Sequence, residues 1–256
     1  TKTGYAWAIA RDDRSWGGSD PPAVVFRYAP GRGKEHAKKL LGDYAGLLQC
    51  DGYAGYKSLS CGEANGPTLA FCWAHVRRQF YDLAKSGAAP IATEALRRIA
   101  ELYAIEAQLR GKSPEVRRAA RQAKSKPLVT ALFTWFEMQL ARLPGRAPTA
   151  EKIRYALNHR EGLERFLGDG RLDMDTNVVE RAIRPVCLSR KNALFASGDD
   201  GGERWAWIAS LVETCKLNGV DSQRYFTDVL TRLVNGWLES RIDELMPWHW
   251  APAKNS

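Results

Sequence analysis

The feature that most constrains the fold is a change in hydrophobic periodicity near residue 72. Before it, β-branched and aromatic residues form short clusters bounded by turn-forming residues, which is typical of strands. After it, apolar residues recur every three or four positions, which is typical of amphipathic helices. The sequence therefore predicts an α/β protein in which a sheet is followed by a long helical block.

The N-terminal part predicts strands and one short helix. Residues 5–10 and 23–28 are rich in strand formers and flank a stretch of Gly, Ser and Pro, so we expect a hairpin. Leucines and lysines over 33–44 are spaced as in a short amphipathic helix. Apolar runs at 46–51 and 68–72 indicate two more strands, and the first of these ends in a carboxylate.

The middle of the chain, about residues 85–168, has the pattern of a basic, all-helical insertion. A helix starting at Trp73 leads into it, and apolar spacing predicts further helices over 91–109, 128–143 and 150–167. Prolines mark expected helix starts and breaks at positions 114, 127, 144 and 148.

The C-terminal part returns to a mixed pattern. We expect a short helix over 178–184 that Pro185 ends or kinks, and a strand over 193–196. A helix over 203–217 follows, and Asp221 or Ser222 is positioned to cap the next one.

Positive charge is concentrated in the helical block. The formal net charge of the chain is +9, and residues 85–165 hold sixteen basic and eight acidic residues, which accounts for most of it. Residues 109–126 (LRGKSPEVRRAARQAKSK) alone carry seven basic residues and one acidic residue. Such a run suits the phosphates of a nucleic acid, and the alternative is a solvated helix surface.

The five cysteines do not form a disulfide framework, because they are odd in number and widely spaced. We expect reduced thiols. Cys61, Cys72 and His75 are three candidate zinc ligands, but the spacing lacks a C-x2-C pair and no fourth ligand is evident. Buried thiols are the alternative.

Several functional classes are disfavoured. A chain of 256 residues suffices for one large domain or two modest ones, and no apolar stretch reaches the ~18 residues of a membrane span. No glycine-rich phosphate loop and no G-x-S-x-G elbow is present, which argues against a nucleotide-cofactor enzyme and a serine hydrolase. The start at Thr1 lacks a secretory signal, so we expect a cytoplasmic protein, and it lacks an initiator Met, which suggests truncation.

Two carboxylates remain as candidates for chemistry. Asp51 follows a predicted strand and Glu180 lies in a predicted first helical turn, and carboxylates on such scaffolds bind hard divalent cations. Each has a structural alternative: Asp51 opens an Asp-Gly turn, and Glu180 is spaced to pair with Arg184.

Long blocks of sequence carry a family resemblance, and they occur in order along nearly the whole chain. The first four blocks are LQCDGYAGY (48–56), CWAHVRRQF (72–80), NVVERAIRP (177–185) and RKNALFASGDDGGER (190–204). These blocks resemble the signatures of insertion sequence 66 family transposases. The later blocks LVETCKLNGV (211–220) and YFTDVL (225–230) resemble that family's C-terminal element.

The resemblance implies a ribonuclease H-like mixed sheet whose Asp-Asp-Glu triad binds two Mg²⁺ or Mn²⁺ ions and cuts and joins DNA. Asp51 matches the second Asp and Glu180 matches the Glu. The first Asp of the family lies upstream of the block that matches Thr1, so this chain begins after it. Asp12 and Asp13 are the weak alternative as its substitutes, since they match another stretch of the family.

The same resemblance and the basic run suggest further site residues. His75 and Asn177 are expected to support the site, and a packed, hydrogen-bonded role is the alternative for His75. The residues expected to contact DNA phosphates are Arg77, Arg78, Arg110, Arg117, Arg118, Arg121, Lys124, Arg181 and Arg184.

We therefore predict a transposase catalytic core over residues 1–204, with its helical insertion at about 85–168, and a C-terminal helical element over 205–250. Its expected partners are the double-stranded DNA of the element ends and target, bound as a homo-oligomer in the cytoplasm with no membrane contact. A noncatalytic remnant that binds DNA through basic helices is the alternative. A third possibility is a helical interaction module that packs residues 203–250 against a partner.

Overall fold

A computed structural model describes residues 3–52, 56, 66–87, 89–189 and 196–251 of the chain. It divides into two compact units. Residues 1–13, 19–32 and 178–256 form what we call the hairpin unit, and residues 14–18 and 33–177 form the helical unit. Among the described residues, no helix has both the length and the apolar character needed to cross a membrane.

The hairpin unit is built on two antiparallel strands, as the sequence predicts. Strand β1 (Tyr5–Arg11) pairs with β2 (Ala23–Ala29), and Ala8 lies opposite Phe26 in the register. Alternation places Val24 and Phe26 on the buried face, where they pack with Ala182 and Ala206. The expected hairpin is confirmed.

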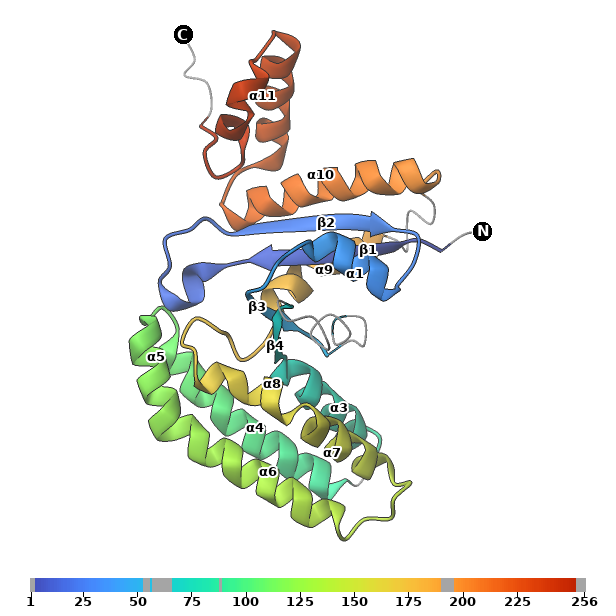
Figure 1. Ribbon diagram of the computed structural model, residues 1–256, viewed down its shortest axis with the longest axis vertical. Helices are drawn as coiled ribbons and strands as arrows, with labels where there is room; N and C mark the ends of the chain where they lie inside the picture. Colours follow the sequence, from blue (N-terminus) through green and yellow to red (C-terminus); the bar gives the residue numbers. More distant parts are fainter. Residues whose placement is uncertain (1–2, 53–55, 57–65, 88, 190–195, 252–256) are drawn as a thin grey trace. The chain divides into compact units, whose positions relative to one another are not determined.

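Helix α10 (Asp199–Leu217) lies along the outer edge of β2 (Figure 1). The Thr214 hydroxyl accepts a hydrogen bond from the Val24 amide and donates one to the Val24 carbonyl, at 3.2 and 3.1 Å. One turn earlier, the Ser210 hydroxyl accepts from the Phe26 amide at 2.8 Å. The helix therefore satisfies backbone groups that an edge strand otherwise leaves open to aggregation.

Two other helices of this unit were expected, and one of them is longer than predicted. Helix α9 (Asn177–Ser189) contains Pro185 in its interior, so the expected end at this proline is wrong, and the alternative of a kink there stays a prediction. Helix α11 (Ser222–Val234) is capped by Asp221, whose side chain accepts from the Arg224 amide, as expected. A 3-10 helix, η4 (Glu239–Leu245), closes a small core with α11. The predicted strand over 193–196 falls almost wholly outside the described residues.

The helical unit begins with helix α1 (Lys34–Leu41) and a two-stranded parallel sheet of β3 (Leu47–Cys50) and β4 (Thr68–Phe71). Both strands were expected from their apolar runs. Helix α3 (Trp73–Lys85) starts two residues after β4 and buries Trp73, Val76 and Phe80, which share one helix face.

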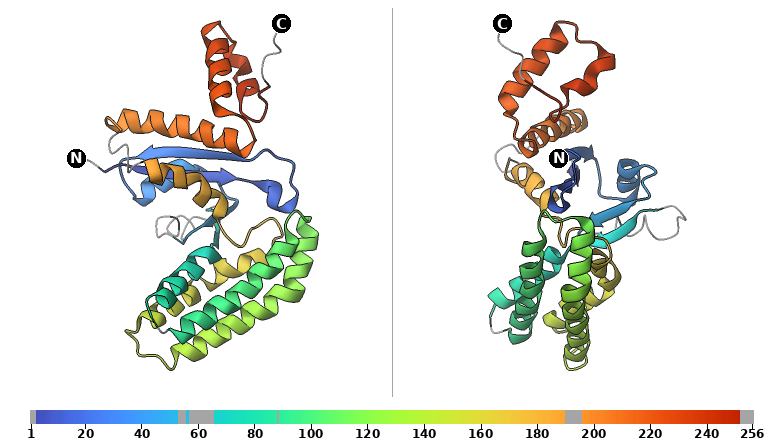
Figure 2. Two further views of the ribbon diagram at one scale, coloured as in Figure 1. Left: turned by 180° about the vertical axis from the view of Figure 1, so that it is seen from behind. Right: turned by 90° about the vertical axis from the view of Figure 1, so that its left-hand side faces the viewer.

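The rest of this unit is a helical bundle. Figure 2 shows its two longest helices, α4 and α6, side by side in both views. Its elements are α4 (Pro90–Leu109), α5 (Pro114–Ala120), the π-helical turn η2 (Arg121–Ser125), α6 (Lys126–Leu140), α7 (Pro148–Asn158), α8 (Arg160–Glu164) and the 3-10 turn η3 (Arg165–Leu167). A further 3-10 turn, η1 (Asp13–Trp16), contributes Ser15, whose carbonyl accepts from the Gly111 amide at 2.8 Å.

The helix boundaries confirm one expectation and correct another. Pro127 lies in the first turn of α6, as expected for a proline that marks a helix start, although α5, η2 and α6 follow one another without a gap. The π-helical turn η2 lies just before this proline. Proline has no N–H for the carbonyl four residues earlier, and a π turn is one way for a helix to pass such a point. The single helix expected over 150–167 is divided at His159, between α7 and α8.

The protein is thus a mixed α/β chain, mostly helical, and its described strands form two small sheets. The main core lies in the helical unit and includes Trp73, Phe80, Phe133 and Phe136. Phe80 and Phe136 stack with ring centroids 5.3 Å apart.

Candidate functional site

Asp51 lies at the carboxyl end of the parallel β3–β4 pair. Its neighbour Cys50 is buried, whereas Asp51 itself is exposed, so its carboxylate is accessible at the sheet edge. The Asp51 carbonyl accepts a hydrogen bond of 2.9 Å from the hydroxyl of Tyr155 on α7. Burial and the nearby negative charge of Asp51 raise the pKa of Tyr155 to about 12, so this hydroxyl stays protonated at neutral pH.

Asp51 is followed by a glycine in the left-handed backbone region. Gly52 has a φ of +81°, and a Cβ at this position would lie 2.9 Å from Nε2 of His159. Only glycine meets both conditions without strain. The positive φ of Gly52 suits the Asp-Gly turn that we considered as an alternative, and this alternative stays a prediction because residues 53–55 lie outside the described part of the chain.

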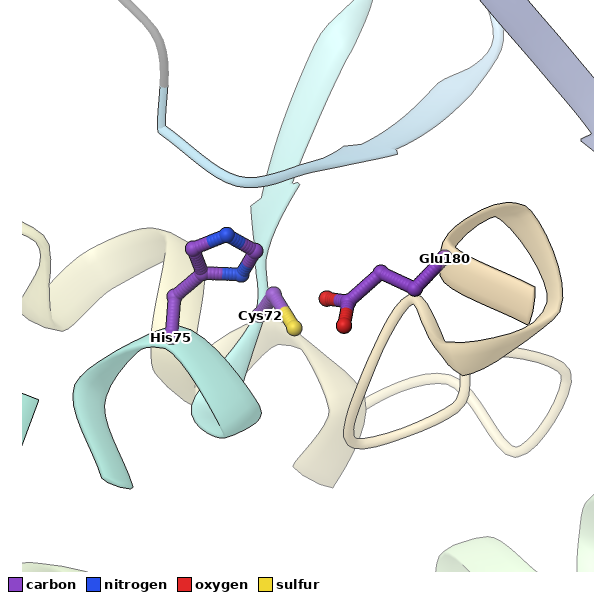
Figure 3. Close-up of side chains that lie close together, drawn as sticks. All are labelled: Cys72, His75 and Glu180. Carbon is purple, nitrogen blue, oxygen red and sulfur yellow. The ribbon is translucent and has the colours of Figure 1, made fainter. Parts of the chain in front are cut away.

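Cys72 and His75 lie at the neighbouring strand end (Figure 3). Cys72 is buried between β4 and α3, and His75 occupies the first turn of α3. The Cys72 sulfur and a His75 ring nitrogen lie within 4.8 Å of each other. Two such ligands are half of the four that a structural zinc site needs. Cys61 lies outside the described residues, so zinc binding by Cys61, Cys72 and His75 stays a prediction.

The segment 172–177, which leads into α9, is fixed to the helical unit along its length. The Trp73 amide donates to the Met174 carbonyl at 3.0 Å, and the Thr176 amide donates to the Cys72 sulfur at 3.3 Å. The side-chain amide of Gln49 donates to the Asp173 carbonyl. These bonds join the segment to the last residues of β3 and to the residues that directly follow β4.

Asn177 begins α9 and is held by a local carboxylate. Its backbone and side-chain amides donate to Asp175 at 3.1 and 2.6 Å. Partial burial, followed by the charge of Asp175, raises the pKa of Tyr103, so a neutral hydroxyl lies close to this carboxylate. Asp175 therefore holds the start of the helix that carries Glu180, and a supporting role of Asn177 in the site stays a prediction.

Glu180 lies in the first turn of α9, in the hairpin unit, where Figure 3 labels it. It is partly buried, and the exposed Arg181 and Arg184 follow it on the same helix. A carboxylate in a first helical turn is stabilised by the positive end of the helix dipole.

The structure corrects the expectation for two of the basic residues. Arg117 is 2% exposed and Arg121 is 0% exposed. The Arg121 guanidinium donates two hydrogen bonds to Glu106, at 2.8 and 2.6 Å, and further bonds to the carbonyls of Phe166 and Asp169. Side chains committed to interior partners in this way do not contact a DNA phosphate.

Arg117 is held by a second set of interior partners. Its guanidinium donates to the Leu172 carbonyl and to the Asp173 carboxylate, at 3.2 and 2.7 Å. We therefore remove Arg117 and Arg121 from the DNA-contacting residues. The other predicted phosphate ligands of the helical unit are exposed: Arg77, Arg78, Arg110, Arg118 and Lys124.

The structure also bears on the suggested substitutes for the first Asp. Asp13 is 9% exposed, and its carboxylate accepts two hydrogen bonds from Arg11, at 3.1 and 2.7 Å. A carboxylate neutralised in this way is a poor metal ligand, which argues against Asp13 as a substitute.

Sequence reasoning missed the supports of the site. Tyr155 is 104 residues from Asp51, and Arg117 is 56 residues from Asp173. No motif or local spacing links residues at such separations. The one available signal was the run of basic residues, which we assigned entirely to the surface.

Comparison with known proteins gives one consistent result. Residues 1–204 match a family model described as "Transposase IS66 family", and residues 210–248 match a second model described as "IS66 C-terminal element". No solved structure matches the chain significantly.

Similar curated proteins come from Sinorhizobium fredii (strain NBRC 101917 / NGR234). "Uncharacterized protein y4qI" is 46% identical over 257 residues, which cover 98% of this chain and 48% of that protein. "Uncharacterized protein y4jD" is 40% identical over 255 residues, covering 98% of this chain and 50% of that protein. The chain thus spans about half the length of the curated relatives it matches.

Proposed function

Because the chain belongs to the IS66 family of transposases, we propose that it forms the part of such an enzyme that cuts DNA strands and joins them to a target. The observation that carries this proposal is the family match over residues 1–204, which includes the blocks around Asp51 and Glu180. Its substrates are the DNA at the element ends and at the target, met in the cytoplasm.

We propose that the two small sheets belong to a ribonuclease H-like core. The antiparallel hairpin and the parallel β3–β4 pair, with Asp51 at a strand end, are compatible with such a core. The helical bundle between Asp51 and Glu180 is then the insertion, and residues 205–250 are the C-terminal element.

Asp51 and Glu180 fit divalent metal ions by their chemistry. Both are carboxylates, which Mg²⁺ and Mn²⁺ prefer, and Asp51 is exposed at the end of a buried strand, where the Tyr155 hydrogen bond fixes its backbone. Two ions are expected in the complete site. When bound there, the ions supply activation of the attacking oxygen and stabilisation of the leaving oxygen.

The remaining residues bind and orient the DNA. Exposed arginines and lysines neutralise phosphates without reading sequence, which makes binding sensitive to salt. Arg77 and Arg78 do so on α3, Arg110, Arg118 and Lys124 at the bundle, and Arg181 and Arg184 beside Glu180. His75 supports the site from α3. Transposition joins two ends, so we propose a homo-oligomer on DNA.

A DNA-binding protein without catalysis is the second candidate. It is favoured by the same exposed basic side chains, which need no metal, and by the hydrogen-bonded state of Asp13. This candidate keeps the salt-sensitive binding and loses the chemistry.

Strand transfer of a pre-cut DNA end tests the proposal. The assay uses Mg²⁺ or Mn²⁺ with the chain as given, a form extended upstream, and the variants Asp51→Asn and Glu180→Gln of each. Asp43→Asn, which neutralises another exposed carboxylate of the helical unit, is the control. We expect the two site variants to lower activity at least ~100-fold while DNA binding and the control are unchanged. Binding without strand transfer in every form would leave the noncatalytic candidate.

A further inference from the structure

The outer face of α3 carries a hollow, and the proposed function gives a role to its two arginines but none to its tyrosine. It has a volume of about 290 Å³ and is lined by Ala74, Arg77, Arg78, Tyr81 and Asp82. These positions follow one another at helical spacing, so they share a single face of α3. The opposite face, with Trp73, Val76 and Phe80, is buried in the core. The hollow therefore lies on a rigid, well-anchored helix.

Tyr81 is the unusual residue of this face. Its side chain is 49% exposed, although an aromatic ring is most stable when buried. Arg77 and Arg78 are exposed one turn before it, and Asp82 follows it. The hollow thus combines an accessible aromatic ring, two guanidinium groups and one carboxylate.

This combination is the one that binds unpaired nucleotides. An aromatic ring stacks on any base, and neighbouring cations hold the phosphates on either side. A carboxylate accepts a hydrogen bond from an exocyclic amino group of a base. The volume lies just below the ~300 Å³ of the smallest typical ligand sites, which suits a single base and is too small for a duplex.

The position of the hollow connects it with Asp51. Strands β3 and β4 are parallel, so Asp51 and the start of α3 at Trp73 lie at the same edge of their sheet. Tyr81 is eight residues into α3, about 12 Å along the helix axis at ~1.5 Å per residue. A DNA strand that passes Asp51 reaches Tyr81 within a few nucleotides.

We propose that this hollow holds an unpaired nucleotide of the DNA strand on which the enzyme acts. The Tyr81 ring stacks on the base, and Arg77 and Arg78 hold the flanking phosphates. The inference rests on the proposed function for the identity of the nucleic acid. The inference adds that the enzyme prefers a DNA end with unpaired bases to a fully paired DNA end.

Binding measurements test this without any catalysis. Fluorescence anisotropy in EDTA compares three labelled DNAs: a flush-ended duplex, the same duplex with a three-nucleotide overhang, and a single strand. We expect Tyr81→Ala to weaken binding of the overhang and the single strand about tenfold and of the flush duplex less than about twofold. Tyr81→Phe, which keeps the ring, restores wild-type binding. Tyr44→Ala, at another tyrosine that is 46% exposed, is the control and leaves all three unchanged.

Two outcomes would overturn the inference: an equal loss for flush and overhanging DNA, or no loss for either. The Asp51→Asn variant separates this result from the proposed function, because it removes the proposed metal ligand and leaves α3 intact. A Tyr81-dependent preference for unpaired ends without strand transfer in any form supports the inference and contradicts the proposed function. Strand transfer together with DNA binding that does not depend on Tyr81 supports the proposed function and contradicts the inference.

Discussion

One short basic run of the helical unit contains both buried and exposed side chains. The inner residues, Arg117 and Arg121, are buried and bonded to carboxylates and backbone carbonyls. The outer residues, Arg118 and Lys124, are exposed, and Arg110 is exposed just before the same helix. Residues of one type, within one short run, thus occupy opposite environments.

This difference separates charge that stabilises the fold from charge that is available to a ligand. The inner arginines tie three parts of the unit together: Glu106 on α4, the turn after η3, and the segment that leads to Asn177. The outer residues have no comparable role in the fold. Substitutions of the inner and the outer residues should therefore alter different properties, and the predictions below follow from the larger effect to the smaller.

Loss of Arg121 should have the largest effect. Arg121→Met leaves the Glu106 carboxylate, which is 13% exposed, one buried carbonyl and one partly buried carbonyl without the Arg121 donor. Breaking a buried ion pair by removing one partner costs about 3–5 kcal/mol, and we expect the free energy of unfolding to fall by that amount. Urea unfolding followed by circular dichroism measures it, with Arg118→Met as the exposed control. The double variant Arg121→Met with Glu106→Leu should recover part of the lost free energy of unfolding, because it also removes the unpaired carboxylate. Equal stability of Arg121→Met and Arg118→Met would contradict the prediction.

Loss of Arg117 should have a smaller and more local effect. Arg117→Met removes one bond to the Leu172 carbonyl and one to Asp173, which is itself partly exposed, so we expect a loss of about 2 kcal/mol. The amide of Thr176 should also exchange with solvent faster, because the segment that holds it against Cys72 is loosened. Hydrogen exchange read by NMR or mass spectrometry measures this. Unchanged protection of the 172–177 segment would show that Arg117 does not fix it.

Neutralising the outer residues should change binding and leave stability alone. In the triple variant Arg110→Gln, Arg118→Gln and Lys124→Gln, we expect about tenfold weaker DNA binding at low salt. The slope of log affinity against log salt should fall by about 2.7, since each phosphate contact contributes about 0.9. The triple variant Lys34→Gln, Lys38→Gln and Lys39→Gln on α1 removes the same number of charges from the same unit and is the control, which should keep the wild-type salt slope. A wild-type salt slope in the triple variant would remove these residues from the DNA surface.

The contrast between the buried and the exposed basic residues also shows which features of the protein could be predicted from its sequence. The hairpin, β3, β4 and the main helices follow from local periodicity, which the sequence displays directly. Asp51 and Glu180 were found because they lie inside long family blocks. The burial of Arg117 and Arg121 depends on Asp173 and Glu106, at separations of 56 and 15 residues, and the edge protection of β2 depends on a pair 190 residues apart. Local patterns carry no information about such contacts, so charge alone placed both arginines on the surface.

Exposed ion pairs should give the smallest effect of all. On α4, the Glu94 carboxylate accepts hydrogen bonds from Arg97 and Arg98 at 2.8 and 2.7 Å, and the Arg97 bond, followed by that of Arg98, lowers the pKa of Glu94 to about 2. A lowered pKa in the folded state means that the pair adds stability above the ordinary pKa of Glu, near 4.5 in the unfolded chain, and loses it as the pH falls towards 2.

The expected contribution is small because solvent screens the pair. Glu94→Gln should lower the thermal midpoint by less than about 2 °C at pH 6, and the difference from wild type should vanish near pH 2. Thermal unfolding of both proteins between pH 2 and pH 6 measures this, and Arg121→Met provides the comparison with a buried pair. A drop as large as that of Arg121→Met would mean that exposure does not decide the value of an ion pair in this unit. The division between inner and outer charge would then lose its physical basis.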